Sequence, residues 1–323
     1  MCHALLASGL DVIMDTQKMP LVGRFAPTPS GRMHLGNVFA ALLAWLSVRS
    51  RDGEMVLRME DLDTLRTSPE FAEILREDLT WLGLTWDRET PAQSSRSQIY
   101  DDCFHQLEER GLLYPCYCTR SQLHSVNAPH LSDGTYIYPG TCRDLTRAQR
   151  EAFSRMPAWR LRVPDREYAL EDRCCGSFRQ NLSRECGDFL VRRADGVYMY
   201  QLAVVVDDGL SGVTEVVRGR DLLESAPRQM YLQELLGFSH PQYAHVPMLL
   251  SADGRRLSKR DKDLDLGQLR SRIRPEVLIG WLAHAAGLTD RPEAVSAWEL
   301  AQKFSWEQVK KQDVFVDTAR FCL

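Results

Sequence analysis

The chain has 323 residues, 44% of them hydrophobic and 26% charged, which is typical of a globular protein with one large domain and an insertion, or with two modest domains. Its net charge of −4 argues against a strongly cationic, non-specific nucleic-acid binder, although a local basic patch could still bind a folded RNA. No apolar stretch is long enough to cross a bilayer, and nine cysteines without an export signal argue against a disulfide framework. We therefore expect a cytoplasmic protein that does not associate with membranes.

The first third of the chain alternates between strand and helix patterns. A short buried strand is predicted over 21–26, followed by a turn and a helix over 38–48 with apolar residues at helical spacing. A second strand is predicted over 54–60 and a second helix over 68–83, which begins with a serine cap and a proline. A third helix is predicted over 99–111. This order is typical of a parallel α/β sheet.

The pattern changes in the middle of the chain. Cysteines, prolines and short alternating runs between 112 and 198 indicate an inserted module. The apolar run YQLAVVVDD at 200–208 is predicted to be a buried strand that resumes the main sheet, and 213–219 to be another strand. Helices are predicted again around 277–286 and 298–304.

We predict an α/β fold: a Rossmann-like, parallel-sheet nucleotide-binding domain with an inserted subdomain and a small helical C-terminal subdomain. Residues 1–20 are interpreted as a disordered extension, because their apolar patch has no basic region before it. The catalytic domain is expected to be split between 21–113 and 197–266, with the insertion at 114–196 and the helical subdomain at 267–323.

A phosphate site is predicted in the turn APTPSGRMHLGN at 26–37, which joins a strand to a helix. Backbone N–H groups and the positive end of a helix dipole favour an anion at such a junction. His34 and Asn37 lie one helical turn apart and can both donate to one ligand, and Gly36 allows a nucleotide to approach the backbone closely. Taken alone, the segment could equally be an ordinary structural junction.

A second phosphate-binding element is suggested by RRLSKRDKD at 255–263, which follows an Asp-Gly turn. A mobile cationic loop containing Lys259 suits a triphosphate and the charge that grows on departing pyrophosphate. The alternative is a solvated basic surface loop, which is the commoner reason for a run of charges.

Together, the two segments resemble the paired signatures of class I aminoacyl-tRNA synthetases. HLGN stands where that family has HIGH, with Asn37 in place of the second histidine, and RLSKR stands where it has KMSKS. The resemblance implies a Rossmann-like fold. It also implies ATP binding by His34, Gly36, Asn37 and Lys259, with catalytic roles for His34, Asn37 and Lys259.

An amino-acid pocket is suggested by Arg24, Glu60, Tyr200 and Arg218, which fall at the ends of predicted strands. In an open parallel sheet, the carboxyl ends of strands face the ligand crevice. Each residue alone could form an ordinary salt bridge at the rim. As a set, two arginines can bind a side-chain carboxylate while Glu60 faces an α-ammonium group. Arginine has only donors, so glutamine would leave its NH₂ group without an acceptor, at a cost of about 1–3 kcal/mol.

Four segments resemble the glutamyl-tRNA synthetase family closely: GRFAPTPSGRMHLGN, RMEDLD, YQLAVVVDD and VVRGRDL. Thr28 stands where that family usually has serine, which keeps the hydroxyl. The resemblance implies that glutamate is contacted by Arg24, Phe25, Ala26, Pro27, Thr28, Glu60, Tyr200 and Arg218.

A metal site is suggested by the thiols of Cys116, Cys118 and Cys142, which lie in a loop-rich part of the predicted insertion. Thiolates favour tetrahedral Zn²⁺, whereas isolated cysteines are more often small buried apolar residues. The nearby tyrosine of YPGTC would be an unusual fourth ligand, because its phenol has an ordinary pKa of about 10. His124 and His130 are more conventional candidates.

The choice of the fourth metal ligand follows from a resemblance to the short relatives called glutamyl-Q tRNA(Asp) synthetases. They carry a zinc site of the form C-x-C, Y-x-x-x-C, which implies one structural Zn²⁺ bound by Cys116, Cys118, Tyr138 and Cys142. Gln201 also resembles these relatives, because full-length glutamyl-tRNA synthetases commonly have asparagine there. The helical domains with which the full-length enzymes read the anticodon are missing from this sequence.

The resemblance implies an enzyme, a ligase, that activates L-glutamate with ATP and Mg²⁺ without needing tRNA. It then attaches glutamate to queuosine in the anticodon of tRNA(Asp), and we expect it to act as a monomer. One alternative is a minimal glutamyl-tRNA synthetase that charges a tRNA 3′ end. A catalytically inactive RNA-binding paralogue is disfavoured by the intact site residues, and a nucleotidyltransferase such as pantothenate synthetase by the glutamate-pocket set.

Overall fold

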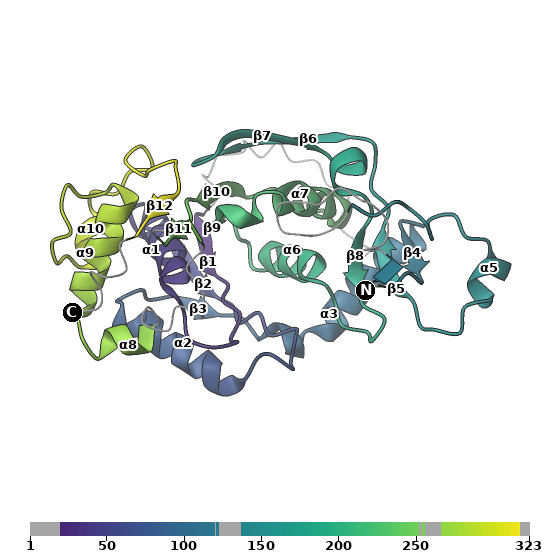
Figure 1. Cartoon of the computed structure of the whole chain (residues 1–323), viewed down its shortest axis with the longest axis horizontal. Coiled ribbons are helices and arrows are strands. Elements are labelled where there is room, and N and C mark those ends of the chain that lie inside the picture. The colour runs from purple at the N-terminus through teal and green to yellow at the C-terminus, as the bar shows by residue number, and fades with distance from the viewer. Residues whose placement is uncertain (1–19, 120, 123–136, 252–253, 256–265, 317–323) are drawn as a thin grey trace, which may run out of the picture.

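The computed structural model of the chain describes residues 20–119, 121–122, 137–251, 254–255 and 266–316. In these ranges a parallel sheet lies between a helical end and an antiparallel end, which Figure 1 shows at the left and right of the molecule. No helix among these residues is both long and apolar enough to cross a membrane.

The parallel strands form two small sheets that come from distant parts of the chain. One part pairs β1 (Val22–Phe25) with β2 (Glu54–Leu57) and β2 with β3 (Arg88–Glu89), all parallel. The other pairs β9 (Glu215–Gly219) with β10 (Gln242–Val246), also parallel. This arrangement confirms the predicted parallel α/β architecture.

Hydrogen bonds across more than half of the sequence place β9 beside β1. Thr214 N donates to Val22 O at 2.9 Å, and Arg24 Nη1 donates to Val217 O at 2.9 Å. The carboxyl ends of β1 and β9 therefore lie next to each other, as a split nucleotide-binding sheet requires.

The described helices of the catalytic part are α1 (Leu35–Arg49), α2 (Pro69–Trp81), α3 (Ser97–Glu109), α6 (Tyr200–Leu210) and α7 (Ser225–Leu236). The first three follow the predicted pattern, and no helix was predicted for the last two. A short 3-10 helix, η1 (Gln93–Ser95), precedes α3, and another, η3 (Arg220–Leu222), follows β9. Ser68 accepts from Phe71 N at 3.2 Å, which confirms the predicted serine cap of α2.

The prediction of a strand over 200–208 was wrong, because these residues form most of α6. Leu202 to Val206 are all buried, so the helix is surrounded by protein on every side and shows no amphipathic period. A short, wholly apolar run does not distinguish a buried strand from a buried helix. Tyr200 therefore lies at the beginning of a helix rather than of a strand.

The middle of the chain forms two antiparallel units. One is a three-stranded sheet in which β5 (Ala158–Leu161) lies between β4 (Leu113–Cys116) and β8 (Phe189–Arg192). The other is a hairpin of β6 (Glu167–Asp172) and β7 (Gly176–Asn181), which lies over α7 and β10 in Figure 1 and contacts both. Two short helices complete this part, α5 (Arg147–Glu151) and the π-helix η2 (Leu182–Cys186).

The C-terminal part is helical and packs against α1. It contains α8 (Leu266–Arg270), α9 (Pro275–Ala286) and α10 (Ala297–Ala301), together with the short parallel pair β11 (Leu249–Leu250) and β12 (Val314–Phe315). Trp298 meets Trp45 edge to face with ring centres 5.0 Å apart, and Trp306 Nε1 donates to Ser47 Oγ at 2.9 Å. Two aromatic contacts thus hold this part against the helix that follows β1.

Candidate active site

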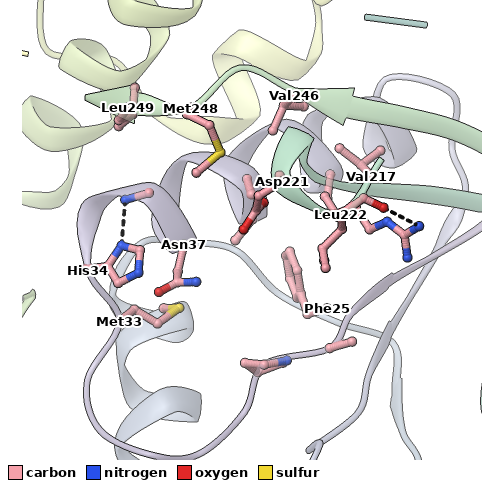
Figure 2. Close-up of a pocket in the computed structure, with 18 of the residues that line it drawn as sticks. Phe25, Met33, His34, Asn37, Val217, Asp221, Leu222, Val246, Met248 and Leu249 are labelled. Atoms are coloured by element: carbon pink, nitrogen blue, oxygen red, sulfur yellow. Dashed lines mark hydrogen bonds between the residues drawn. The ribbon is translucent and has the colours of Figure 1, made fainter. Parts of the chain in front are cut away.

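A cavity of about 620 Å³ opens where the carboxyl ends of β1 and β9 meet the beginning of α1. Its walls come from the turn after β1, from α1, from β9 and from the segment that follows β10. Figure 2 shows His34 and Asn37 on one side of this space and Val217 and Leu222 on the other. The position matches that of ligand crevices in open parallel sheets.

The backbone at the start of α1 prepares the cavity for an anion. His34 is the N-cap residue, with φ −92° and ψ 166°, and its Nδ1 accepts from Gly36 N at 3.2 Å (Figure 2). Because Nδ1 is the acceptor, a neutral imidazole carries its proton on Nε2, where it can act as a donor. The first turn of α1 therefore directs the helix dipole and two polar side chains toward one region, while its Gly36 and Asn37 N–H groups donate within the turn.

Arg24 reaches the cavity from β1. Its side chain is only 5% exposed, Nη1 donates to Val217 O at 2.9 Å, and Nε lies 3.7 Å from Asp208 Oδ2. Burial, together with the nearby positive charges of Arg58 and Arg218, lowers the pKa of this guanidinium despite Asp208. An additional anion in the cavity would favour its charged form.

Arg218 enters the same cavity from β9 and is also 5% exposed. Its Nε donates to His245 Nε2 at 3.0 Å, Nη1 to Gln229 Oε1 at 2.8 Å, and Nη2 to Leu222 O at 3.2 Å. Tyr200 Oη lies 3.5 Å from Nη1. All these partners are neutral at neutral pH, and no carboxylate in the described part of the chain lies within ion-pair distance of Arg218. A buried guanidinium with this environment is suited to an anionic ligand.

Beneath the two arginines, Arg58 is completely buried and surrounded by acids. Its Nη1 donates to Asp208 Oδ1 at 2.6 Å and its Nη2 to Glu60 Oε1 at 2.9 Å, with Asp207 Oδ2 at 3.8 Å from Nε. Burial alone would lower the pKa of Arg58, but these carboxylates raise it above its ordinary value. Burial raises the pKa of Glu60 in spite of Arg58, so a cationic ligand group near Glu60 would favour its ionised form.

The structure brings most of the sequence-predicted residues together. The cavity is lined by Arg24, Phe25, Ala26, Pro27, His34, Gly36, Asn37 and Arg218. Thr28 is exposed and is not part of the lining. Glu60 and Tyr200 are not part of the lining either, and they contact Arg58 and Arg218 respectively.

Lys259 lies outside the described residues, but the residues on either side of its segment are near the cavity. Leu249 lines the cavity, and Leu266 N donates to the carbonyl of Met33, another lining residue, at 3.2 Å. Asp78 joins the turn before α1 to α8, because its Oδ1 accepts from Arg32 at 3.1 Å and from Arg270 at 2.7 Å.

Sequence reasoning missed the residues that hold Arg218 in place. Gln229 Nε2 donates to Gln201 Oε1 at 2.9 Å, and Gln201 Nε2 donates to Ser225 Oγ at 3.1 Å, so the Gln229 oxygen is turned toward Arg218. Asp208 was also missed, although two consecutive acids at the end of an apolar run are a signal for buried ion pairs. Nothing in the local sequence signals the role of His245.

The three thiols of the predicted metal site do come together. The Sγ atoms of Cys116, Cys118 and Cys142 all lie within 4.8 Å of one another, and Cys118 Sγ and Cys142 Sγ are 3.6 Å apart. Tyr138 Oη lies 3.5 Å from Cys116 Sγ and 3.6 Å from Cys118 Sγ. Tetrahedral zinc with Zn–S bonds of about 2.3 Å separates its sulfurs by about 3.8 Å, so these four donors fit such an ion. His124 and His130 lie outside the described residues.

The surroundings of this cluster favour thiolate at Cys116, whereas burial and the neighbouring thiols raise the pKa of Cys118 to about 11. Arg160 Nε donates to Cys116 Sγ at 3.3 Å, and its guanidinium lies 3.7 Å from the centre of the Tyr138 ring. Burial would raise the pKa of Cys116, but the charge and hydrogen bond of Arg160 contribute to lowering it below its ordinary value. Tyr117 N also donates to Cys142 Sγ at 3.4 Å. Donors of this kind orient and stabilise thiolate ligands.

Comparisons with known proteins agree with this geometry. Residues 20–320 match the family of class I tRNA synthetases (E and Q), catalytic domain. A protein of Symbiobacterium thermophilum named glutamyl-Q tRNA(Asp) synthetase is 47% identical over 309 residues, with 91% of this chain and 95% of that protein covered. One of the same name from Neisseria meningitidis is 42% identical, with 89% and 96% covered. The solved glutamate tRNA ligase of Elizabethkingia meningosepticum, in complex with its amino acid, is 27% identical with a TM-score of 0.80, covering 94% of this chain and 68% of that chain.

The buried acids beneath the cavity should be more important for stability than exposed acids. Replacing Asp208→Asn removes a charge that faces both Arg58 and Arg24, and we expect a loss of about 3 kcal/mol in the free energy of unfolding. Chemical denaturation followed by circular dichroism measures this loss. The matched control is Asp144→Asn, at an exposed acid 3.4 Å from Arg162, which should change little. Equal losses for the two variants would contradict the role assigned to Asp208.

Proposed function

This chain belongs to the family of class I tRNA synthetases (E and Q), and on that premise we propose that it activates L-glutamate with ATP and transfers the glutamate to queuosine in the anticodon of tRNA(Asp). The relatives named glutamyl-Q tRNA(Asp) synthetase support this acceptor, because this chain spans nearly all of their length. A minimal synthetase that charges a tRNA 3′ end is the rival function.

The observation that carries the proposal is the pair of buried arginines that line the cavity. Arg218 has no carboxylate partner among the residues that the structure describes, and Arg24 stands in the same lining at the end of the adjacent strand. A ligand carboxylate would supply the counter-charge that Arg218 lacks. Glu60, close behind, is the acid that we assign to the α-ammonium group.

The hydrogen-bonding capacity of Arg218 explains a preference for glutamate over glutamine. Its acceptors in the protein are His245, Gln229 and the Leu222 carbonyl, and the guanidinium has only donors left to offer a ligand. A glutamine amide would place its NH₂ against these donors. A mismatch of this type in a buried site discriminates strongly between substrates.

For activation, we propose that the α-carboxylate of glutamate attacks the α-phosphorus of ATP in line, with pyrophosphate as the leaving group. His34 Nε2, Asn37 and the first turn of α1 hold the phosphates, and Lys259 is assigned to the developing charge on pyrophosphate. Mg²⁺ would accompany ATP and neutralise part of the phosphate charge. A hydroxyl of queuosine then attacks the glutamyl carbonyl of the adenylate and displaces AMP.

The acceptor is tested with labelled glutamate, ATP and tRNA(Asp), with or without queuosine. We expect label only on the queuosine-containing tRNA, and only in the anticodon fragment after nuclease digestion. Label should persist when the 3′-terminal adenosine of the tRNA is removed. Label that disappears with this adenosine would establish the minimal synthetase instead, and absence of glutamate-dependent pyrophosphate exchange would remove both functions.

The amino-acid pocket is tested with Arg218→Gln, which removes the positive charge and keeps a polar side chain. We expect kcat/KM for glutamate in pyrophosphate exchange to fall about 100-fold or more, with little change in the KM for ATP. The matched control is Arg179→Gln, at an arginine on β7 that is 65% exposed, which should leave both constants unchanged. If the two variants behaved alike, Arg218 would not bind the substrate.

We also propose that Cys116, Cys118, Tyr138 and Cys142 bind one Zn²⁺, as the arrangement of their donor atoms supports. The metal would join the end of β4 to the segment around Cys142, and its part is structural. No step of the reaction is assigned to it.

Metal analysis of the purified protein tests this site. We expect about one zinc ion per chain in the unchanged protein and almost none in Cys142→Ala, because three donors rarely retain structural zinc. Cys103→Ala is the control, since Cys103 lies on α3 outside the cluster. Zinc that is absent from the unchanged protein, or retained by Cys142→Ala, would contradict the assignment.

A further inference from the structure

A short chain of hydrogen bonds leads from the β6–β7 hairpin to the amino-acid pocket. Asp172 Oδ2 lies 2.6 Å from His245 Nδ1, and His245 Nε2 lies 3.0 Å from Arg218 Nε. Asp172 is 5% exposed and His245 is completely buried. His245 does not line the cavity itself, so any influence on a ligand passes through Arg218.

The chemistry of arginine fixes the proton position along this chain. Arg218 Nε can only donate, so His245 Nε2 has to be the acceptor and the imidazole proton lies on Nδ1, facing Asp172. Burial, with Arg218 nearby, lowers the pKa of His245 to about 4 in spite of Asp172, so the imidazole is neutral at pH 7. Burial would raise the pKa of Asp172, but its bonds to His245 and to backbone N–H groups lower it to about 2.

Asp172 is itself held in a fixed orientation. Its Oδ1 accepts from the backbone N–H groups of Cys174 at 2.9 Å, Cys175 at 2.8 Å and His245 at 3.0 Å. The two turn donors, Cys174 N and Cys175 N, bond only to Oδ1, whereas His245 N lies 3.0 Å from both oxygens, and Oδ2 also faces the imidazole. The turn of the hairpin therefore presents an acceptor at a defined position beside β10.

We propose that Asp172 and His245 are positioning residues for substrate recognition: they hold the Arg218 guanidinium in the orientation that receives the side-chain carboxylate of the amino acid. This inference rests on the proposed function. It makes the hairpin, which belongs to the predicted insertion, a part of the specificity apparatus. Neither residue touches the substrate.

Replacing Asp172→Asn is a sharp test, because the backbone donors of Cys174 and Cys175 should retain the amide oxygen at the Oδ1 position. The NH₂ group then faces His245 Nδ1 and favours the tautomer with the proton on Nε2, an effect expected whenever asparagine replaces the aspartate behind a histidine. Two donors, His245 Nε2–H and Arg218 Nε–H, would then oppose each other and displace the guanidinium.

The tautomer can be observed directly by NMR of protein with ¹⁵N-labelled histidine, with His245→Gln used to assign the signal. We expect Nδ1 to be protonated in the unchanged protein and Nε2 in Asp172→Asn. This measurement requires no substrate, so it separates a failure of the relay from a failure of the proposed function. An imidazole protonated on Nε2, or on both nitrogens, in the unchanged protein at pH 7 would overturn the inference.

Kinetics then measure the consequence. In pyrophosphate exchange, we expect Asp172→Asn to raise the KM for glutamate about 10- to 100-fold and to change the KM for ATP less than about 2-fold. Glu171→Gln is the matched control, because Glu171 is the neighbouring acid on β6 and is exposed, so it should have no effect. An equal change in both KM values would show a general structural role and would overturn the proposal.

A second pair of variants keeps the test decisive if Asp172→Asn does not fold. His245→Gln retains an oxygen that can accept from Arg218 Nε, whereas His245→Leu has no acceptor. We expect the leucine variant to raise the KM for glutamate at least about 10-fold over the glutamine variant. Equal KM values in the two variants would show that the acceptor for Arg218 is not needed.

Discussion

Burying the guanidinium of Arg218 is the constraint on which the rest of the site depends. A buried charge is costly unless acceptors or a counter-ion surround it. The protein supplies neutral acceptors, His245, Gln229 and the carbonyl of Leu222, and these satisfy hydrogen bonds without cancelling the charge. Arg58 is the contrasting case, because three carboxylates lie within ion-pair distance of it and already compensate its charge. The difference between these two arginines distinguishes a binding residue from a structural one.

The topology makes this arrangement possible. Arg24 and Arg218 are far apart in sequence, but β1 and β9 lie side by side, so their carboxyl ends deliver both side chains to one cavity. The beginning of α1 lines the same cavity, and the helix dipole there favours phosphate. An amino acid and a nucleotide can therefore be bound side by side, as formation of an adenylate requires. Asp78 adds to this by joining Arg32, before α1, to Arg270, after the segment that contains Lys259.

Local sequence patterns were sufficient to predict a feature where all its residues lie within a few positions of one another. The strand, turn and helix around His34 and the serine cap of α2 could be predicted from local patterns, and family resemblance singled out Arg24 and Arg218. The helix α6 could not, because its residues are buried on all sides and carry no periodic signal. The roles of His245 and Asp172 could not be predicted for a different reason. Their role exists only where a hairpin meets β10, and no spacing in either segment encodes that contact.

The contact between the hairpin and β10 connects the predicted insertion to Arg218. Its antiparallel sheet lies at the far end of the molecule from the C-terminal helices in Figure 1, and Cys116 of the cysteine cluster is the last residue of β4 in that sheet. The hairpin turn instead reaches back to the parallel sheet and contributes a buried carboxylate to the acceptor that holds Arg218. Because Asp172 accepts from backbone N–H groups of its own turn and of β10, its position depends on both the hairpin and β10. On the proposed function, recognition of the amino acid therefore depends on both parts of the chain.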